Sequence, residues 1–176
     1  SNTFLLEKEF GWNGILVEPA SIWHNDLKNN RNCIIDTKCV YSKSGEDMEF
    51  IVVDNDGKDD PSLSSLKKYI NNNDWASSIR REKHKKEIVK TITLDELLDF
   101  HKAPSTIDYL SIDTEGSEYD ILENFNFSKR KIKIITVEHN YDQKKRRLIF
   151  ELLKNNGYKR VFVNISDFDD WYILEN

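Results

Sequence analysis

The sequence predicts an α/β fold in which helices cover both faces of a mainly parallel sheet. Two observations indicate this class. Short apolar runs alternate along the chain with segments of helical periodicity, which is the pattern of repeated strand–helix units. Several of these runs are apolar almost throughout, which is typical of parallel strands that are buried on both faces. The length of 176 residues suits one domain, so we expect a single domain over residues 1–176.

End signals define several of the expected elements. Ser21 and Thr93 suit the N-caps of helices, and Glu96 stands at the capping-box position after Thr93. Gly157 is placed to end the last helix. Helices are expected over Asn2–Phe10, Ser21–Asn30, Leu94–His101, Ser117–Phe125 and Gln143–Asn156. Strands are expected over Gly14–Val17, Cys33–Tyr41, Met48–Val53, Ile88–Ile92, Ile107–Ile112, Ile132–Val137, Val161–Asn164 and Trp171–Leu174.

The stretch Asp54–Lys86 has a different composition. It is rich in Asp, Asn, Ser and Lys and has little periodicity, so we expect a long excursion with one or two short helices near Leu66–Ile70. Such long loops are often lids or binding loops. The stretch ends in a basic run, which is most simply a solvated helix face or a mobile loop. The run consists of Arg80, Arg81, Lys83, Lys85 and Lys86.

Charge and cysteine content limit the classes of partner. The formal net charge of −5 gives no overall attraction to nucleic acid or to an anionic membrane. Cys33 and Cys39 would lie about 20 Å apart in an extended strand, beyond disulfide reach, so we expect free thiols and a reducing compartment. Because no apolar run approaches the ~18 residues of a membrane span and no signal peptide is visible, we expect a soluble cytoplasmic protein.

Acidic residues stand where three expected strands end. Glu18, Asp113 and Glu138 each follow an apolar run directly. In doubly wound sheets, ligands bind beyond the carboxyl ends of the strands, and an acid there can hold a ribose through its hydroxyls. Strand ends are commonly polar in any case, so Glu18 alone is a weak indication of such a site.

The residues around Asp113 and Glu138 give stronger indications. Gly116 allows an unusual backbone dihedral, and Glu118 suits the dipole of the following helix. Asp113 and Glu115 have no comparable explanation beyond ordinary turn chemistry. Glu138 and His139 could be a base and the group that orients it, or two metal ligands. The alternative is a structural histidine whose partner is a neighbouring carboxylate.

Several segments together closely resemble the FkbM-type methyltransferases, and the resemblance runs from residue 1 to about residue 174. The segments occur in the family's order and spacing. They are Gly14-Ile15-Leu16-Val17-Glu18-Pro19, Thr93-Leu94-Asp95-Glu96-Leu97-Leu98, Tyr109-Leu110-Ser111-Ile112-Asp113-Thr114-Glu115-Gly116-Ser117-Glu118 and Val137-Glu138-His139-Asn140.

The resemblance implies a three-layer, Rossmann-like class I methyltransferase fold whose sheet is mostly parallel with an antiparallel last strand. It implies methyl transfer from S-adenosylmethionine to a hydroxyl of a sugar, a glycan or a secondary metabolite. The family's first strand and its glycine-rich cofactor turn would precede Ser1. We therefore expect an N-terminally incomplete domain that belongs to a longer protein. The alternatives are an inactive remnant, and a strand that another segment or a partner chain supplies.

The resemblance also implies roles for particular residues. Cofactor-binding positions would be Glu18, Pro19, Cys39, Val40, Asp113 and Glu115, with Glu18 on the ribose, Cys39 and Val40 at the adenine, and Asp113 beside the transferred methyl. Catalytic positions would be Asp113, Glu138 and His139, which border the acceptor.

A magnesium ion is a further expectation by analogy with more distant O-methyltransferases. Asp113, Glu138 and His139, or Asn140 in place of the last, would hold the ion, which would lower the pKa of the acceptor hydroxyl. Imidazole is a less typical ligand for magnesium than oxygen is. Without an ion, His139 would be the general base.

Two other functions compete with a small-molecule or glycan methyltransferase. A non-catalytic binding module with this fold would explain the missing first strand. A nucleic-acid methyltransferase is suggested by the basic run, but the net charge and the lack of an Asn/Asp-Pro-Pro-Tyr motif oppose it, so we expect no nucleic-acid partner. Trp75, Tyr69 and Trp171 could stack on a sugar ring, although local packing is their simpler interpretation.

Overall fold

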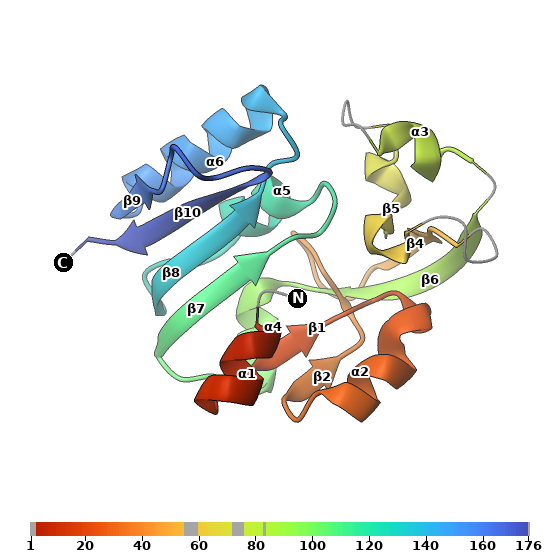
Figure 1. The fold of residues 1–176 in the computed structure, drawn as a ribbon, viewed down its shortest axis with the longest axis horizontal. Coiled ribbons are helices and arrows are strands. Elements are labelled where there is room, and N and C mark those ends of the chain that lie inside the picture. The colour runs from red at the N-terminus through yellow and green to blue at the C-terminus, as the bar shows by residue number, and fades with distance from the viewer. Residues whose placement is uncertain (1–2, 55–59, 72–75, 83, 176) are drawn as a thin grey trace.

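The computed structural model describes residues 3–54, 60–71, 76–82 and 84–175, which form an α/β structure (Figure 1). The predicted α/β class is therefore confirmed. The α-helices are α1 (Phe4–Phe10), α2 (His24–Asn30), α3 (Ser77–Arg80), α4 (Leu94–Phe100), α5 (Glu118–Glu123) and α6 (Gln143–Asn155). The strands are β1 (Ile15–Val17), β2 (Ile34–Asp36), β3 (Cys39–Val40), β4 (Asp47–Val52), β5 (Ser65–Leu66), β6 (Lys85–Ile92), β7 (Thr106–Ile112), β8 (Lys131–Glu138), β9 (Tyr158–Val161) and β10 (Asp169–Leu174). Short 3₁₀ turns cover Ser21–Trp23, Pro61–Leu63 and Lys67–Tyr69.

These strands form three sheets within the described residues. The largest part of the core lies on the sheet β7-β8-β10-β9, in which β7 and β8 are parallel and β10 is antiparallel to both of its neighbours. β1 and β2 form a parallel pair. The sheet β3-β6-β4-β5 combines one parallel pair with two antiparallel pairs. A reversed strand near the C-terminus is thus present, whereas one mainly parallel sheet is not observed.

The sheet is interrupted between β1 and β7. Neither strand has a hydrogen-bonded neighbour on that side among the described residues, although β1 lies beside β7 in Figure 1. Ile15 and Val17 of β1 nevertheless pack against the same core as Ile107 and Leu110 of β7. The interruption therefore falls where the family resemblance expects its first strand, in the middle of the sheet.

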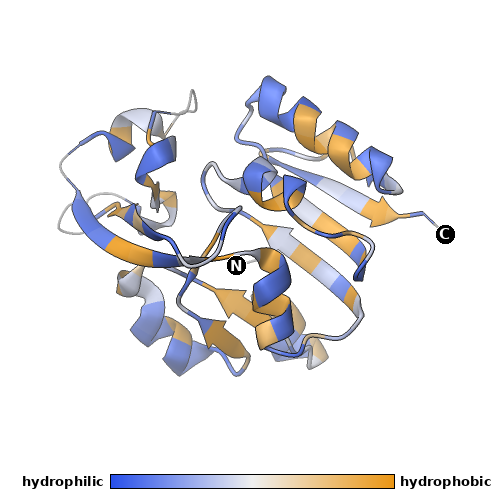
Figure 2. Cartoon of the chain, turned by 180° about the vertical axis from the view of Figure 1, so that it is seen from behind, coloured by the Kyte–Doolittle hydropathy of each residue, from blue (hydrophilic) through white to orange (hydrophobic). Residues whose placement is uncertain are grey.

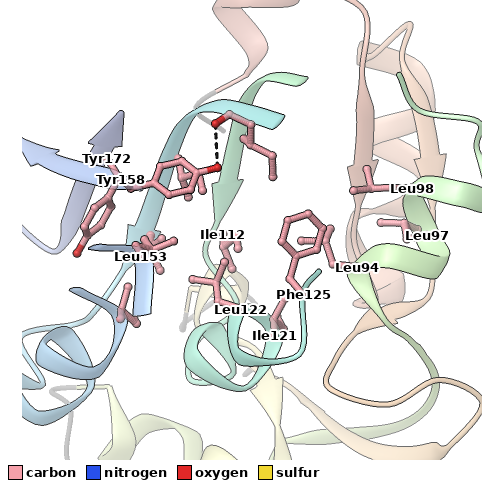
Figure 3. Packing of buried hydrophobic residues seen from close by; sticks show 14 of the residues in the cluster. Leu94, Leu97, Leu98, Ile112, Ile121, Leu122, Phe125, Leu153, Tyr158 and Tyr172 are labelled. Carbon is pink, nitrogen blue, oxygen red and sulfur yellow. Dashed lines mark hydrogen bonds between the residues drawn. The ribbon is translucent and has the colours of Figure 1, made fainter. Parts of the chain in front are cut away.

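The main core joins the β7–β10 sheet to three helices. Figure 3 shows leucines of α4, the α5 residues Ile121 and Leu122, and Leu153 of α6 converging on the strands. Tyr158 closes one end of this core, where its hydroxyl donates to the carbonyl of Ile132 at 2.9 Å. Hydrophobic and hydrophilic residues alternate along α6 in Figure 2, so one stripe of the helix is buried while the rest faces solvent.

Most predicted elements are present within one to three residues of their expected ends. Thr93 caps α4 as predicted, because its hydroxyl accepts a hydrogen bond from the Glu96 N–H. In a complete capping box the Glu96 side chain would accept the Thr93 N–H. Here the Thr93 N–H donates to the Ser44 hydroxyl instead, at 2.8 Å. Gly157 follows α6 with φ of +85°, as a helix-ending glycine should.

Two predicted strands were wrong in extent. The expected strand over residues 33–41 is two strands, because the Asp36 carboxylate accepts the Lys38 N–H at 2.9 Å and turns the chain between β2 and β3. The expected strand over residues 161–164 is displaced to β9. There Phe162 has φ of +55°, and its carbonyl accepts the N–H groups of Ile165 and Ser166, which form a turn instead.

The cysteines, the helices and the excursion also bear on the sequence predictions. Cys33 and Cys39 are free, as predicted. Among the described residues, no helix has both the length and the apolar character that a membrane crossing requires. The 54–86 excursion contains α3, β5 and two 3₁₀ turns, one of which falls at the predicted position near residue 66.

Truncation of Leu122 should destabilise the protein strongly. Leu122 is 0% exposed in the core between α5 and the β7–β10 sheet, so Leu122→Ala should lower the free energy of unfolding by about 2–5 kcal/mol. Leu148→Ala on α6 is the matched control, because Leu148 is 41% exposed, and it should change stability by less than about 0.5 kcal/mol. Urea unfolding of both variants measures this difference, and equal losses would contradict the described core.

Candidate functional site

A cavity of about 220 Å³ opens where β1, β3 and β7 end. Leucines of α4 and Ile121 of α5 line its apolar side, together with side chains of β1 and β7. The structure brings all six residues predicted to bind cofactor to this cavity: Glu18, Pro19, Cys39, Val40, Asp113 and Glu115. Segments that lie far apart in the sequence therefore form a single lining here, as expected for the carboxyl ends of neighbouring strands.

Glu18 is held at the rim directly after β1. Its Oε1 accepts the Ala20 N–H at 2.8 Å, and His24 Nε2 contacts the Glu18 carbonyl oxygen at 2.8 Å. Burial raises the pKa of Glu18, and the negative charge of Asp113 adds to the effect. Nearby, burial raises the pKa of Cys39 to about 12, so this residue is a neutral thiol in the wall rather than a nucleophile.

The turn after β7 is organised by Glu118. The fully buried Glu118 Oε1 accepts hydrogen bonds from the Thr114 N–H at 3.0 Å, the Thr114 hydroxyl at 2.9 Å and the Gly116 N–H at 2.9 Å. Its other oxygen pairs with Lys145 Nζ of α6 at 3.2 Å. Glu118 therefore fixes the turn that carries Asp113, a larger role than the helix-dipole effect that the sequence indicated.

Glu115 occupies an uncommon backbone conformation in this turn. Its φ is +56°, a region that non-glycine residues rarely adopt. The Glu115 carboxylate pairs with the buried guanidinium of Arg80 and accepts the Asn140 side-chain amide at 3.0 Å. The Ser65 hydroxyl donates to the Glu115 carbonyl at 3.0 Å.

Three carboxylates meet at the edge shared by β7 and β8. One oxygen each from Asp113, Glu115 and Glu138 lies within 4.8 Å of the others. Glu138 is 6% exposed, and its Oε2 has no hydrogen-bond partner among the described residues. Burial, and next the charge of Asp113, raise the pKa of Glu138 to about 10, so Glu138 holds a proton at neutral pH when no cation is bound.

Asp113 differs from Glu138 in its access to solvent. Asp113 is exposed and lines the cavity, although the neighbouring protein atoms still desolvate its carboxylate. This partial desolvation and the nearby charge of Glu118 raise the pKa of Asp113. The Asp113 carboxylate is therefore the member of the cluster that a ligand in the cavity can reach.

His139 does not join this cluster. Its ring is buried, its Nδ1 accepts the Tyr141 N–H at 3.1 Å, and its Nε2 lies 3.8 Å from Asp170 Oδ1. Burial first, and then the positive charge of Arg146, lower the pKa of His139, so the ring is neutral near pH 7. The structure thus unites Asp113 with Glu115 and Glu138, and it directs His139 towards Asp170.

Several lining residues were not foreseen. The excursion contributes Pro61, Ser62 and Ser64, and the helical turn before α2 contributes Trp23. Arg80 was expected on a solvated face, but its side chain is fully buried, and only its charged neighbours in the sequence suggested exposure. The spacing of Thr114 and Glu118 was a usable signal, because an acid four residues after a threonine can accept its hydrogen bonds.

Local packing, the simpler interpretation of the aromatic residues that could stack on a sugar, holds for the two that are described. Trp171 stacks on Tyr109 with centroids 6.5 Å apart, and Tyr69 is buried and donates its hydroxyl to Asp120. Trp75 and Lys83 lie outside the described residues. Of the other residues of the basic run, Arg81, Lys85 and Lys86 are exposed as expected.

Comparison with protein families supplies the decisive observation. The family model described as the methyltransferase FkbM domain matches residues 1–160. The chain belongs to this family. It is therefore a methyltransferase-family protein, and the cavity that gathers the family's motif residues is the candidate active site of that family. Comparisons with curated proteins and with solved structures returned no match.

The protonation of Glu138 should be visible in the pH dependence of stability. Its ordinary pKa of 4.5 applies in the unfolded chain, and its folded pKa is raised to about 10. Between these values the folded state binds more protons, so this residue makes the free energy of unfolding fall as pH rises. Glu138→Gln removes the titration, and the stability of the variant relative to the wild type should therefore increase with pH across that window.

Urea unfolding in the presence of a chelator, at several pH values within the window, measures this difference. Glu151→Gln is the matched control, because Glu151 is exposed on α6. A relative stability of Glu138→Gln that stays constant with pH would contradict the raised pKa.

Proposed function

We propose that the protein transfers the methyl group of S-adenosylmethionine to a hydroxyl oxygen within the cavity at the ends of β1, β3 and β7. The observation that carries the proposal is the convergence of all six motif-derived cofactor positions on this one cavity, in a chain that belongs to a methyltransferase family. The strand order β7-β8-β10-β9 beside the β1-β2 pair supports a class I methyltransferase architecture whose sheet is interrupted between β1 and β7.

The cavity residues fit an adenosine-containing cofactor. A carboxylate such as that of Glu18 can accept hydrogen bonds from both hydroxyls of a ribose, as acids at strand ends do in dinucleotide sites. Val40 and the leucines of α4 offer an apolar surface to an adenine ring. The volume of about 220 Å³ is below the roughly 300–1,000 Å³ of typical ligand pockets, so the cofactor would extend beyond the cavity along its rim.

Asp113 is placed to act on the acceptor. When bound, S-adenosylmethionine supplies an electrophilic methyl group, and the acceptor hydroxyl must lose its proton as the methyl moves. Asp113 can accept that proton, because its carboxylate reaches the cavity and its raised pKa makes it a better base than an ordinary aspartate. Glu138 is buried and protonated, so it adds no second negative charge beside Asp113.

The acceptor in this proposal is a sugar, a glycan or a secondary metabolite. Ser62 of the excursion lines the cavity and is exposed, so its hydroxyl group can pair with an acceptor hydroxyl. The free thiols of Cys33 and Cys39 suit a reducing compartment such as the cytoplasm.

A divalent cation can be part of the same site. Asp113, Glu115 and Glu138 offer three oxygen ligands, which suits magnesium better than the expected set with His139 does. The buried Glu138 Oε2 without a partner is the atom that a cation would satisfy. Such an ion would orient the acceptor hydroxyl and lower its pKa.

The alternative is a binding module that has lost catalysis. The observation that favours it is the interruption between β1 and β7 among the described residues. Binding of S-adenosylhomocysteine by this chain separates the two functions.

Isothermal titration with S-adenosylhomocysteine should detect binding to the wild-type chain and a loss in two variants. Asp113→Asn and Glu18→Gln remove carboxylate acceptors from the cavity, so each should weaken binding roughly tenfold or more. Asp108→Asn is the control, since Asp108 lies on β7 but pairs with Lys133 on the surface. Failure of the wild type to bind at millimolar ligand would favour the inactive module.

Calorimetric titration with magnesium chloride alone tests the cation. The wild type should bind, and Glu138→Gln should bind more weakly because the variant loses an anionic ligand. Glu151→Gln should match the wild type. The metal is rejected if the wild type shows no binding heat and a chelator leaves methyl transfer unchanged.

A further inference from the structure

Arg80 is the most deeply buried charged side chain near the cavity that the proposed reaction does not use. Its side chain is 0% exposed, and it lies at the end of α3 within the excursion. Its Nε donates to the Leu63 carbonyl at 2.8 Å, and its guanidinium pairs with the Glu115 carboxylate. One side chain therefore joins α3, the Pro61–Leu63 turn and the turn after β7.

The residue that Arg80 holds is strained. A non-glycine residue with φ near +56° is in an unfavourable backbone conformation, which persists only where surrounding contacts fix it. Contacts that fix Glu115 include those of Arg80, Ser65 and Asn140, which belong to different segments of the described chain. Asn140 has a positive φ itself, of +44°, at the end of the neighbouring strand β8. Two residues with positive φ, Glu115 and Asn140, are thus hydrogen-bonded to each other, and Arg80 supplies a cationic contact to Glu115.

The same contacts place the excursion against the cavity. Ser64 and Leu66 line the cavity, and the intervening Ser65 bonds to the Glu115 backbone. The Ser64 hydroxyl also accepts the Val53 N–H at 2.9 Å, which ties this wall to the end of β4. Residues 61–66 of the excursion are therefore held at the cavity, and the Arg80–Glu115 pair is a charged contact between the excursion and the turn that carries Asp113.

We propose that Arg80 is a positioning residue of the active site. By holding Glu115, Arg80 fixes the turn over residues 113–118 and keeps residues 61–66, which form one wall of the cavity, in place. The inference rests on the proposed function only in the effect that it expects on cofactor binding. Arg80 does not line the cavity, so its effect must pass through Glu115 and the wall.

The test compares Arg80→Met with Arg81→Met, a matched control because Arg81 is adjacent and exposed. Hydrogen exchange of the apo proteins should show faster exchange of residues 113–118 and 61–66 in Arg80→Met only. Calorimetry well below the unfolding temperature should show S-adenosylhomocysteine binding roughly tenfold weaker in Arg80→Met, the loss expected for a charge-assisted hydrogen bond. Arg81→Met should match the wild type in both measurements.

A double variant separates positioning from stability. If Arg80 acts through Glu115, then Arg80→Met combined with Glu115→Gln should bind S-adenosylhomocysteine no more weakly than the weaker of the two single variants. Glu115→Gln is nearly isosteric, and on its own it should accelerate hydrogen exchange in residues 113–118 and 61–66. This single variant still tests the inference if Arg80→Met fails to fold. Additive losses in the double variant would overturn the proposed route through Glu115.

The outcomes distinguish this inference from the proposed function. Unchanged exchange of residues 113–118 in both Arg80→Met and Glu115→Gln overturns the positioning role, whether or not cofactor binds. A wild type that does not bind S-adenosylhomocysteine counts against the proposed function, while accelerated exchange in Arg80→Met would still support the anchor.

Discussion

The structure depends on how it accommodates several carboxylates at one edge of its sheets. Glu18, Asp113, Glu115, Glu118 and Glu138 all follow or flank strand ends around the cavity. Like charges at this spacing in a partly desolvated site cannot all stay ionised without compensation. The negative charges of these acids are accommodated in different ways. Glu118 accepts backbone hydrogen bonds and pairs with Lys145, Glu115 pairs with Arg80, and Glu138 keeps its proton. Glu18 and Asp113 line the cavity.

This division explains why distant parts of the chain are needed. Lys145 comes from α6 and pairs with Glu118, whereas Arg80 from the excursion and Asn140 from the end of β8 both contact Glu115. The charges of Glu115 and Glu118 are thus compensated by other segments, while Glu18 and Asp113 remain accessible to a ligand. Burial raises the pKa values of Glu18 and Asp113, and a raised pKa together with access suits binding and proton transfer. The excursion thus supplies both a wall and a counter-charge.

The sequence predicted what depends on local pattern and on family motifs. Continuous apolar runs located β7 and β8, and Thr93 and Gly157 located helix ends, because propensity and capping act over a few residues. The six residues expected to bind cofactor line one cavity because strand ends share an edge. The sequence pattern could not predict contacts between residues that lie far apart in the chain. The burial of Arg80, the direction of the His139 ring and the separation into three sheets depend on tertiary contacts, and a charged run or an acid–histidine pair does not specify these contacts.

The central claim is that the cavity between the ends of β1, β3 and β7 is a cofactor site built around Glu18 and Asp113. A crystal structure of the protein with S-adenosylhomocysteine tests it most directly. The account predicts ligand density in this cavity, with the ribose hydroxyls on the Glu18 carboxylate, the adenine against Val40 and the homocysteine sulfur on the Asp113 side. Density that places the ligand elsewhere, or in the cavity without contact to either carboxylate, would contradict it.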